Sequence, residues 1–225
     1  MEQNPLVSII IPTLNEAQNI EGLIQELQVL SGVEIIVSDG GSTDDTLKIC
    51  SRFSVHVCTG PAGRGAQLNR GAQAARADIL LFLHADSHIP EELIEQVIEA
   101  VGQGRLWGCA RIAFDNSAWF YRWLAFVSNL RAGWFSNCYG DQAIFCQKDF
   151  FVEKGKFPET IFLEDLAFSH KARRQQRAFL AAATVISSSR RFQAGGTWRT
   201  VFKMQIIKLL YFLGVKPEQL YRMYR

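Results

Sequence analysis

Short apolar segments alternate with longer amphipathic ones over the first hundred residues of the chain. The apolar segments predict strands at residues 7–11, 34–38, 55–58 and 79–83. Apolar residues at helical spacing predict helices at residues 17–30, 65–76 and 91–101. The segment 79–83 is apolar at every position, which is typical of a strand covered on both faces. Strands and helices in this alternation predict an α/β fold with a parallel sheet.

The second half of the chain has a different pattern. It predicts a strand at residues 106–114, an aromatic helix at 119–130 and a strand near 143–146, followed by two basic, apolar segments. No repeat, low-complexity tract or linker separates the two halves. We therefore expect one domain over residues 1–225, with halves at 1–105 and 106–225.

Composition narrows the class of protein. The 225 residues carry a net charge of +2, which argues against a dedicated nucleic-acid-binding protein. The five cysteines form no Cys-x-x-Cys pair, and their odd number favours reduced, buried thiols in a cytoplasmic protein. No run of 18 apolar residues predicts a membrane span, and the N-terminus lacks the layout of a signal peptide.

Four polar loops follow the four N-terminal strands, at residues 12–16, 39–42, 60–65 and 84–86. In a parallel sheet these loops meet at one edge, where open α/β sheets bind ligands. The sequence Gly63-Arg64-Gly65 opens a helix and offers backbone N–H groups and a guanidinium to an anion. It is neither a dinucleotide fingerprint, because Leu68 replaces the third glycine, nor a Walker A loop.

Asp86 follows the buried strand at residues 79–83 almost directly. A carboxylate at this edge suits Mg²⁺ or Mn²⁺, which are often held by one or two carboxylates together with substrate phosphates. The alternative is that Asp86 only caps the helix predicted at residues 91–101.

Four motifs in order resemble family 2 glycosyltransferases with a GT-A fold. They are VSIIIPTLNE at residues 7–16, DGGSTD at 39–44, LFLHAD at 81–86 and LED at 163–165. Residues 63–69, 140–145 and 189–192 are similar to a compact bacterial branch without transmembrane segments, some members of which are linked to arsenosugar biosynthesis.

The resemblance implies a Rossmann-like, mostly parallel sheet flanked by helices. Residues 1–105 would bind the nucleotide sugar and residues 106–225, with C-terminal helices, the acceptor. It also implies an inverting, hexosyltransferase-type enzyme that moves a sugar from a nucleotide-diphosphate sugar to an acceptor hydroxyl. Asp165 would be the general base, with Glu164 beside it, and Asp86 with Mn²⁺ or Mg²⁺ would hold the diphosphate.

The resemblance assigns further residues by position. The expected nucleotide-sugar-binding residues are Pro12, Thr13, Asn15, Glu16, Asp39, Gly40, Ser42, Arg64, Gln67, Asn69, Ala85 and Asp86. The expected acceptor-binding residues are Gly140, Asp141, Gln142, Arg190 and Arg191. The expected metal ligands are Asp86 and His84, although His84 replaces the usual first aspartate and its binding of metal is left open. A UDP-sugar is favoured over a GDP-sugar as donor.

Several alternatives stay open. Glu164 and Asp165 also suit the first turn of a helix, which favours negative charge. A sugar nucleotidyltransferase or a catalytically silent nucleotide-sugar-binding module would share parts of the pattern. The aromatic segment 119–126 and the segment 201–215 either complete the core or lie at a membrane interface. The second reading would suit a lipid-linked acceptor and a peripheral location on the inner face of the plasma membrane.

Overall fold

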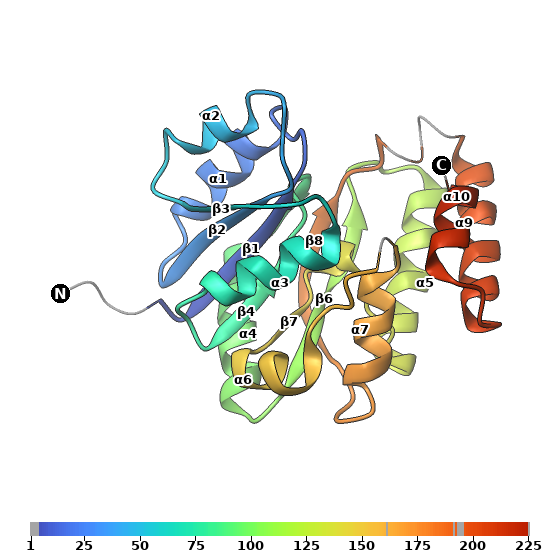
Figure 1. Cartoon of the computed structure of the whole chain (residues 1–225). Helices are drawn as coiled ribbons and strands as arrows, with labels where there is room; N and C mark the ends of the chain where they lie inside the picture. Colours follow the sequence, from blue (N-terminus) through green and yellow to red (C-terminus); the bar gives the residue numbers. More distant parts are fainter. Residues whose placement is uncertain (1–4, 161, 191, 193–195, 225) are drawn as a thin grey trace.

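A computed structural model describes residues 5–160, 162–190, 192 and 196–224, and its strands form one mixed sheet (Figure 1). The strand order is β3-β2-β1-β4-β7-β6-β8-β5. The strands are β1 (Val7–Thr13), β2 (Val33–Asp39), β3 (His56–Thr59), β4 (Ile79–Phe82), β5 (Ser87–His88), β6 (Trp107–Phe114), β7 (Phe145–Gln147) and β8 (Phe179–Ser187).

Helices flank this sheet and form the end of the chain. They are α1 (Ile20–Gln28), α2 (Thr46–Cys50), α3 (Arg64–Ala74), α4 (Glu91–Gly102), α5 (Trp119–Phe135), α6 (Lys148–Phe150), α7 (Glu164–Ala172), α9 (Thr197–Phe212) and α10 (Pro217–Tyr224). A 3₁₀ turn, η1 (Gly140–Gln142), and a π-helical turn, η2 (Phe151–Gly155), complete the described elements.

The N-terminal strands confirm the predicted parallel arrangement. β1 pairs in parallel with β2 and β4, and β2 pairs in parallel with β3. The second half adds antiparallel pairs, because β7 runs against both β4 and β6, while β8 runs parallel to β6. The carboxyl ends of β1 to β4, with their polar loops, therefore lie along one edge of the sheet.

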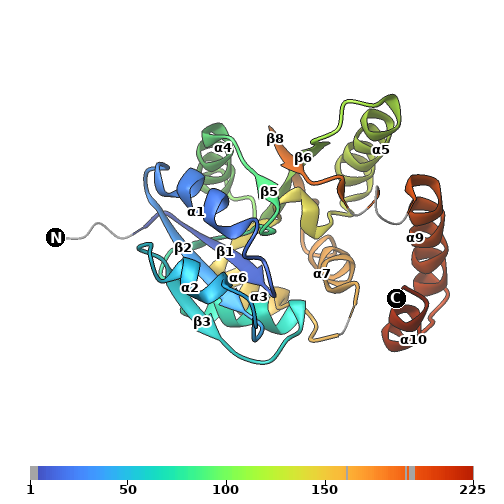
Figure 2. The same cartoon turned by 90° about the horizontal axis from the view of Figure 1, so that it is seen from above.

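Both faces of the sheet are covered by apolar packing. Ile9 of β1 belongs to the cluster that holds the buried face of α1, whereas Ile10 belongs to the cluster of α3. The helix α3 approaches the sheet closely, since a Cβ on Gly71 would lie 2.4 Å from Cγ2 of Ile10. In Figure 2, α1 and α4 lie on one side of the sheet and α3 on the other.

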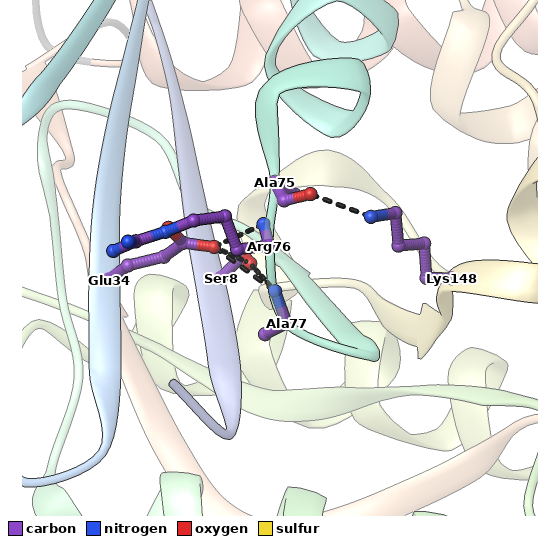
Figure 3. A network of polar contacts seen from close by, with 6 residues as sticks. All are labelled: Ser8, Glu34, Ala75, Arg76, Ala77 and Lys148. Carbon is purple, nitrogen blue, oxygen red and sulfur yellow. Dashed lines mark hydrogen bonds and ion pairs between the residues drawn. The ribbon is translucent and has the colours of Figure 1, made fainter. Parts of the chain in front are cut away.

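A polar network fixes the opposite, amino-terminal end of the strands (Figure 3). Glu34 of β2 has a side chain only 9% exposed. It accepts hydrogen bonds from the Ser8 hydroxyl, from the backbone N–H and the guanidinium of Arg76, and from the backbone N–H of Ala77. Lys148 donates to the carbonyl of Ala75 at 2.6 Å. The turn between α3 and β4 is thereby tied to the strands β1 and β2 and to the helix α6.

The C-terminal part gathers α5, α7, α9 and α10 at the end of the molecule away from α1 and α2 (Figures 1 and 2). A buried cluster of Leu163, Leu166, Ile207 and Leu220 packs α9 and α10 against the start of α7. Within the described residues, no helix is both long and apolar enough to cross a membrane. All five cysteines are free, and all but Cys58 are buried, as expected for reduced thiols.

Candidate active site

A cavity of about 440 Å³ opens at the edge where the polar loops meet. We call it the central cavity. It draws side chains from both halves of the chain: Pro12, Glu16, Arg64, His84, Ala85, Asp86, Phe114, Tyr139, Asp141, Phe162, Leu163, Glu164, Asp165, Ser187, Ser188, Phe192, Thr200, Met204 and Tyr221. The fold thus brings together the carboxylates and the arginine that the sequence singled out.

The first two loops brace each other beside the central cavity. Asn15 has a left-handed backbone, with φ of 58°, and its Oδ1 accepts the N–H of Thr43 at 2.8 Å. The Ser42 hydroxyl accepts the N–H of Asn15 at 2.9 Å. Asparagine tolerates this backbone region better than most residues. Asn15 and Ser42 therefore hold the loops in register.

Asp39 shapes the second loop from within. It is fully buried, and one carboxylate oxygen accepts the N–H groups of Gly41 and Ser42 at 2.8 and 2.9 Å. Burial raises the pKa of Asp39, but hydrogen bonds from Ser42, Gly41 and Thr13 outweigh it and hold the pKa below its ordinary value. Asp39 consequently stays charged inside the loop and does not line the central cavity.

Gln67 and Asn69 of α3 are also engaged with the backbone. The Gln67 amide donates to the carbonyls of Thr13 and Ser38, at 2.7 and 2.9 Å, and so joins the ends of β1 and β2. The Asn69 amide makes a two-way pair with the backbone of Phe157. Both side chains are buried, and neither lines the central cavity.

Arg64 and Glu164 form an ion pair on the cavity wall. Arg64 begins α3 and its Nε lies 3.6 Å from Oε1 of Glu164, whose side chain is only 6% exposed. Burial and the neighbouring Asp165 raise the pKa of Glu164 to about 7, although Arg64 opposes the shift. Glu164 therefore exchanges a proton near neutral pH.

Asp165 is held by a backbone bond from the other side of the cavity. Its Oδ2 accepts the N–H of Gly140, in η1, at 2.8 Å. Directly before the two carboxylates, Leu163 has a φ of 62°, a conformation rarely adopted by a leucine. Backbone strain of this kind clusters at functional sites. The start of α7 is thus a helix N-terminus, as the alternative proposed, and also the wall of the cavity.

His84 lies against the same turn. A Cβ on Gly140 would be 2.6 Å from Nε2 of His84 and 3.6 Å from Oδ2 of Asp165, so both groups face Gly140. His84 and Asp86 line the central cavity together, but the described part of the chain holds no group of three or more His, Cys, Asp or Glu suited to a metal. A cation at Asp86 and His84 would need further oxygen ligands from a bound diphosphate.

A cationic and aromatic group lies next to these carboxylates. The Arg131 guanidinium and the Lys208 ammonium lie 3.5 and 4.4 Å from the centre of the Tyr139 ring. Burial and Arg131 lower the pKa of Lys208 to about 8. The buried Oδ1 of Asp141 has no hydrogen-bond partner in the described structure, and burial raises the pKa of this carboxyl. No motif in the sequence points to Arg131 or Lys208 as part of this site.

The remaining predicted residues lie outside the central cavity. Gln142 is fully buried and accepts a bond from Arg131 at 2.8 Å. Arg190 donates to Asn19 at 2.8 Å and lines a separate cavity of about 290 Å³ that also touches Asp86. Arg191 lies outside the described residues.

The family model described as "Glycosyl transferase family 2" matches residues 8–157, about two thirds of the chain. The chain belongs to glycosyl transferase family 2. The matched range includes three of the four loop motifs and the turn at Gly140. The resemblance drawn from the sequence is therefore confirmed, whereas its link to arsenosugar biosynthesis stays a prediction.

Curated members of the family match part of this chain. A dolichol-phosphate mannosyltransferase of Pyrococcus furiosus is 36% identical over 107 residues, which cover 44% of this chain and 30% of that protein. A PGL/p-HBAD biosynthesis glycosyltransferase of Mycobacterium bovis is 34% identical over 110 residues, covering 44% of this chain and 43% of that one. The chain thus spans less than half the length of these two relatives.

Solved structures show the fold of this family 2 glycosyltransferase. The mannosyltransferase PcManGT of Pyrobaculum calidifontis, in complex with GDP-Man and Mn²⁺, superposes with a TM-score of 0.68 at 20% identity, over 92% of this chain and 63% of that one. TarS of S. aureus, in complex with UDP-GlcNAc, gives 0.64 at 18% identity, over 82% and 58%. The predicted GT-A fold is confirmed.

Proposed function

We propose that this family 2 glycosyltransferase is an inverting, hexosyltransferase-type enzyme. It transfers a sugar from a nucleoside-diphosphate sugar to an acceptor hydroxyl. The observation that carries the proposal is the meeting of Asp165, Asp86 and Arg64 in one cavity at the carboxyl edge of the sheet. Inverting transfer needs a base for the acceptor and positive charge for the leaving diphosphate, and this cavity has groups for both.

Asp165 is the proposed general base. The bond from Gly140 fixes one of its oxygens, so the carboxylate is positioned before an acceptor arrives. It would take the proton of the attacking hydroxyl as that oxygen bonds to the anomeric carbon and the nucleoside diphosphate leaves from the opposite face. Glu164 positions Arg64 through their ion pair.

Arg64, Asp86 and His84 form the proposed diphosphate side. The guanidinium of Arg64 can donate to phosphate oxygens, and Asp86 with His84 would hold Mn²⁺ or Mg²⁺. Such a cation would neutralise charge on the departing diphosphate. Mg²⁺ takes oxygen ligands, so an imidazole in the donor set favours Mn²⁺ over Mg²⁺. A mycobacterial glucosyl-3-phosphoglycerate synthase of similar fold is solved with Mn²⁺ and UDP.

The halves of the chain divide the substrates in this proposal. Residues 1–105 hold the donor, which we take to be a UDP-sugar before a GDP-sugar, with Pro12 and Glu16 on its side of the cavity. Residues 106–225 hold the acceptor near Asp141, whose buried oxygen can accept a hydroxyl hydrogen bond. The free cysteines suit a cytoplasmic enzyme. The names of curated relatives include dolichol-phosphate and undecaprenyl-phosphate transferases, which supports a lipid-linked acceptor and peripheral membrane contact.

Release of the nucleoside diphosphate tests this proposal without knowledge of the acceptor. UDP-glucose, UDP-GlcNAc and GDP-mannose are each incubated with the protein and Mn²⁺, with water as the fallback acceptor. We expect slow release from one donor, lost in Asp165→Asn and kept in Asp45→Asn, which changes an exposed carboxylate paired with Lys48. If no nucleotide is released although one binds, the catalytically silent module suggested by His84 is the better description.

A further inference from the structure

One face of α5 is apolar and exposed. We call its residues the α5 stripe: Trp119, Trp123, Phe126, Val127, Leu130 and Trp134, with exposed fractions between 36% and 68%. Their spacing of three and four residues places them on a single side of the helix. The stripe therefore runs the whole length of α5 on its outer surface.

The opposite face of α5 already packs on the protein. It buries Phe120, Tyr121, Ala125 and Ala132. The 17 residues of α5 contain no acidic side chain, and Arg122 is the one exposed charged residue among them. A surface helix normally turns its apolar face to the core and its polar face to solvent, whereas α5 carries apolar side chains on its outer face as well. The outer face of α5 is not part of the core, so contact with another apolar surface would stabilise it.

A second helix, α9, also carries exposed apolar side chains. α9 exposes Phe202, Leu209 and Leu213, each between 60% and 72%. Figures 1 and 2 place α5 and α9 at the same end of the molecule. Several large apolar side chains exposed along one helix face are typical of an interaction site.

Charge is distributed unevenly along the chain, and this distribution favours an anionic binding partner for the exposed apolar surface. Residues 166–225 contain twelve Lys and Arg but one acidic residue, Glu218, so this part carries +11. Residues 1–165 carry twelve basic and twenty-one acidic residues, or −9. The positive part forms α7, β8, α9 and α10. An anionic surface would attract this end of the molecule.

Basic side chains reach the end of the α5 stripe itself. The Arg177 guanidinium donates to the carbonyls of Gly133 and Trp134 at 3.2 and 3.0 Å, and that of Arg173 donates to the carbonyl of Phe135 at 3.3 Å. Tryptophan beside arginine is typical of segments at the boundary between lipid and water.

We propose that the α5 stripe and the exposed apolar side chains of α9 dock on a bilayer that contains anionic lipids. The tryptophans enter the interfacial layer, and the basic C-terminal part lies over the headgroups. A second copy of the chain fits this surface less well, because a two-fold contact would bring two such positive ends together. Thr200 and Met204 of α9 line the central cavity, so docking places that cavity near the membrane. Delivery of a lipid-linked acceptor to Asp165 in this way rests on the proposed function.

Cosedimentation with vesicles tests the docking surface. Wild type is mixed with vesicles of phosphatidylcholine alone, or with about one quarter phosphatidylglycerol, at low salt. We expect binding to the anionic vesicles with a blue shift of tryptophan emission, at least about tenfold weaker binding to the neutral ones, and loss of binding at about 0.5 M salt.

Variants distinguish binding through this surface from non-specific binding to vesicles. Trp119→Ser with Trp123→Ser should weaken binding about tenfold or more, and so should Arg122→Glu alone, which keeps the apolar stripe. The matched control, Val152→Ser with Lys154→Glu, changes an exposed apolar residue and an exposed lysine on η2 and should bind like wild type. Arg122→Glu serves as the decisive variant if the double tryptophan variant does not fold.

Three results would overturn the docking proposal. They are no binding of wild type to anionic vesicles, equal binding by Arg122→Glu and wild type, and a stable dimer that the tryptophan variant breaks without any lipid binding. Release of nucleotide from the donor is measured in the same samples without vesicles. Its absence would count against the proposed function, whereas its retention in a variant that no longer binds vesicles would separate docking from catalysis.

Discussion

The backbone N–H of Gly140 donates to Oδ2 of Asp165 across 2.8 Å. The bond joins η1 to the start of α7, two segments that lie 25 residues apart in the chain. A side chain at position 140 would meet Nε2 of His84 at 2.6 Å. One glycine thus sets the spacing between the proposed base and the histidine of the metal motif.

Gly140→Ala should reduce turnover more than it reduces binding. The added methyl group must displace His84 or move the turn away from Asp165, and a shift of about 1 Å in a catalytic group can cost about 10²-fold in rate. We expect a loss of roughly that size in kcat, with UDP affinity changed far less. Gly102→Ala is the matched control, because a Cβ there meets nothing within 4 Å. Equal kcat values for both variants would contradict the role given to Gly140.

Glu164 should make the free energy of unfolding fall as the pH rises. Burial and Asp165 raise its pKa from 4.5 to about 7 in the folded protein, so between these values the folded chain holds more of this proton than the unfolded chain. The protonated carboxyl therefore makes its whole contribution to the free energy of unfolding below about pH 4.5, and this contribution is lost as the pH rises through about 7. A shift of this size corresponds to about 3 kcal/mol.

Urea unfolding of Glu164→Gln at pH 5 and pH 8 checks this effect. The glutamine does not titrate, so the variant should gain on wild type between the two values by up to about 3 kcal/mol. Glu95→Gln, on the exposed side of α4, is the matched control. The sign of this change is the critical result. A variant that loses stability relative to wild type as the pH rises from 5 to 8 would mean that Glu164 is not buried in its protonated form.

Glu34 should show the opposite dependence on pH. Burial raises its pKa, but hydrogen bonds from Ser8, Arg76 and Ala77 outweigh it, so the pKa is lowered from 4.5 (Figure 3). The charged form stabilises the fold above about pH 4.5, and this contribution disappears as the pH falls through the lowered pKa. At pH 7, Glu34→Gln should cost about 1–3 kcal/mol in urea unfolding. A cost that grows towards acidic pH would refute this description.

Asp86→Ala should remove the metal dependence of nucleotide binding. If Asp86 and His84 hold the cation, Mn²⁺ should tighten UDP binding to wild type by about tenfold or more and have little effect on the variant. Calorimetry with UDP and with GDP, each with and without Mn²⁺, measures this directly and identifies the donor base. Mn²⁺-independent binding to wild type would argue against a metal at this edge.

The part of the site formed by the loops after β1 to β4 can be predicted from the sequence because these strands form a parallel sheet. The strands β1, β2 and β4 are mostly apolar and the strands β1 to β4 are parallel, so the gathering of Pro12, Arg64 and Asp86 at one edge follows from their order. The LED motif at residues 163–165 predicts the carboxylates of Glu164 and Asp165 as site residues. The left-handed backbone at Leu163 explains how the start of α7 reaches the cavity.

The acceptor side is harder to predict from the sequence because its contacts join residues that lie far apart in the chain. The strand β8, Phe179–Ser187, is not predicted from the sequence, because it contains three alanines, which have low strand propensity, yet it pairs with β6 and supplies Ser187 to the cavity. Lys208 reaches Tyr139 only because α9 folds back over α7. Gln67 and Asn69 lie in a motif that matches the family, but their side chains bind backbone groups and do not line the cavity. The motif alone does not distinguish these two roles.

The central claim is that Asp165 accepts the proton of the acceptor hydroxyl. The most direct test compares Asp165→Asn with wild type by calorimetric UDP binding and by nucleotide release from the donor that wild type uses. The asparagine keeps the shape of the side chain and an oxygen for the Gly140 N–H but cannot act as a base. We predict nucleotide affinity within about twofold of wild type and turnover reduced by about 10²–10⁴-fold. Turnover equal to that of wild type would contradict the claim.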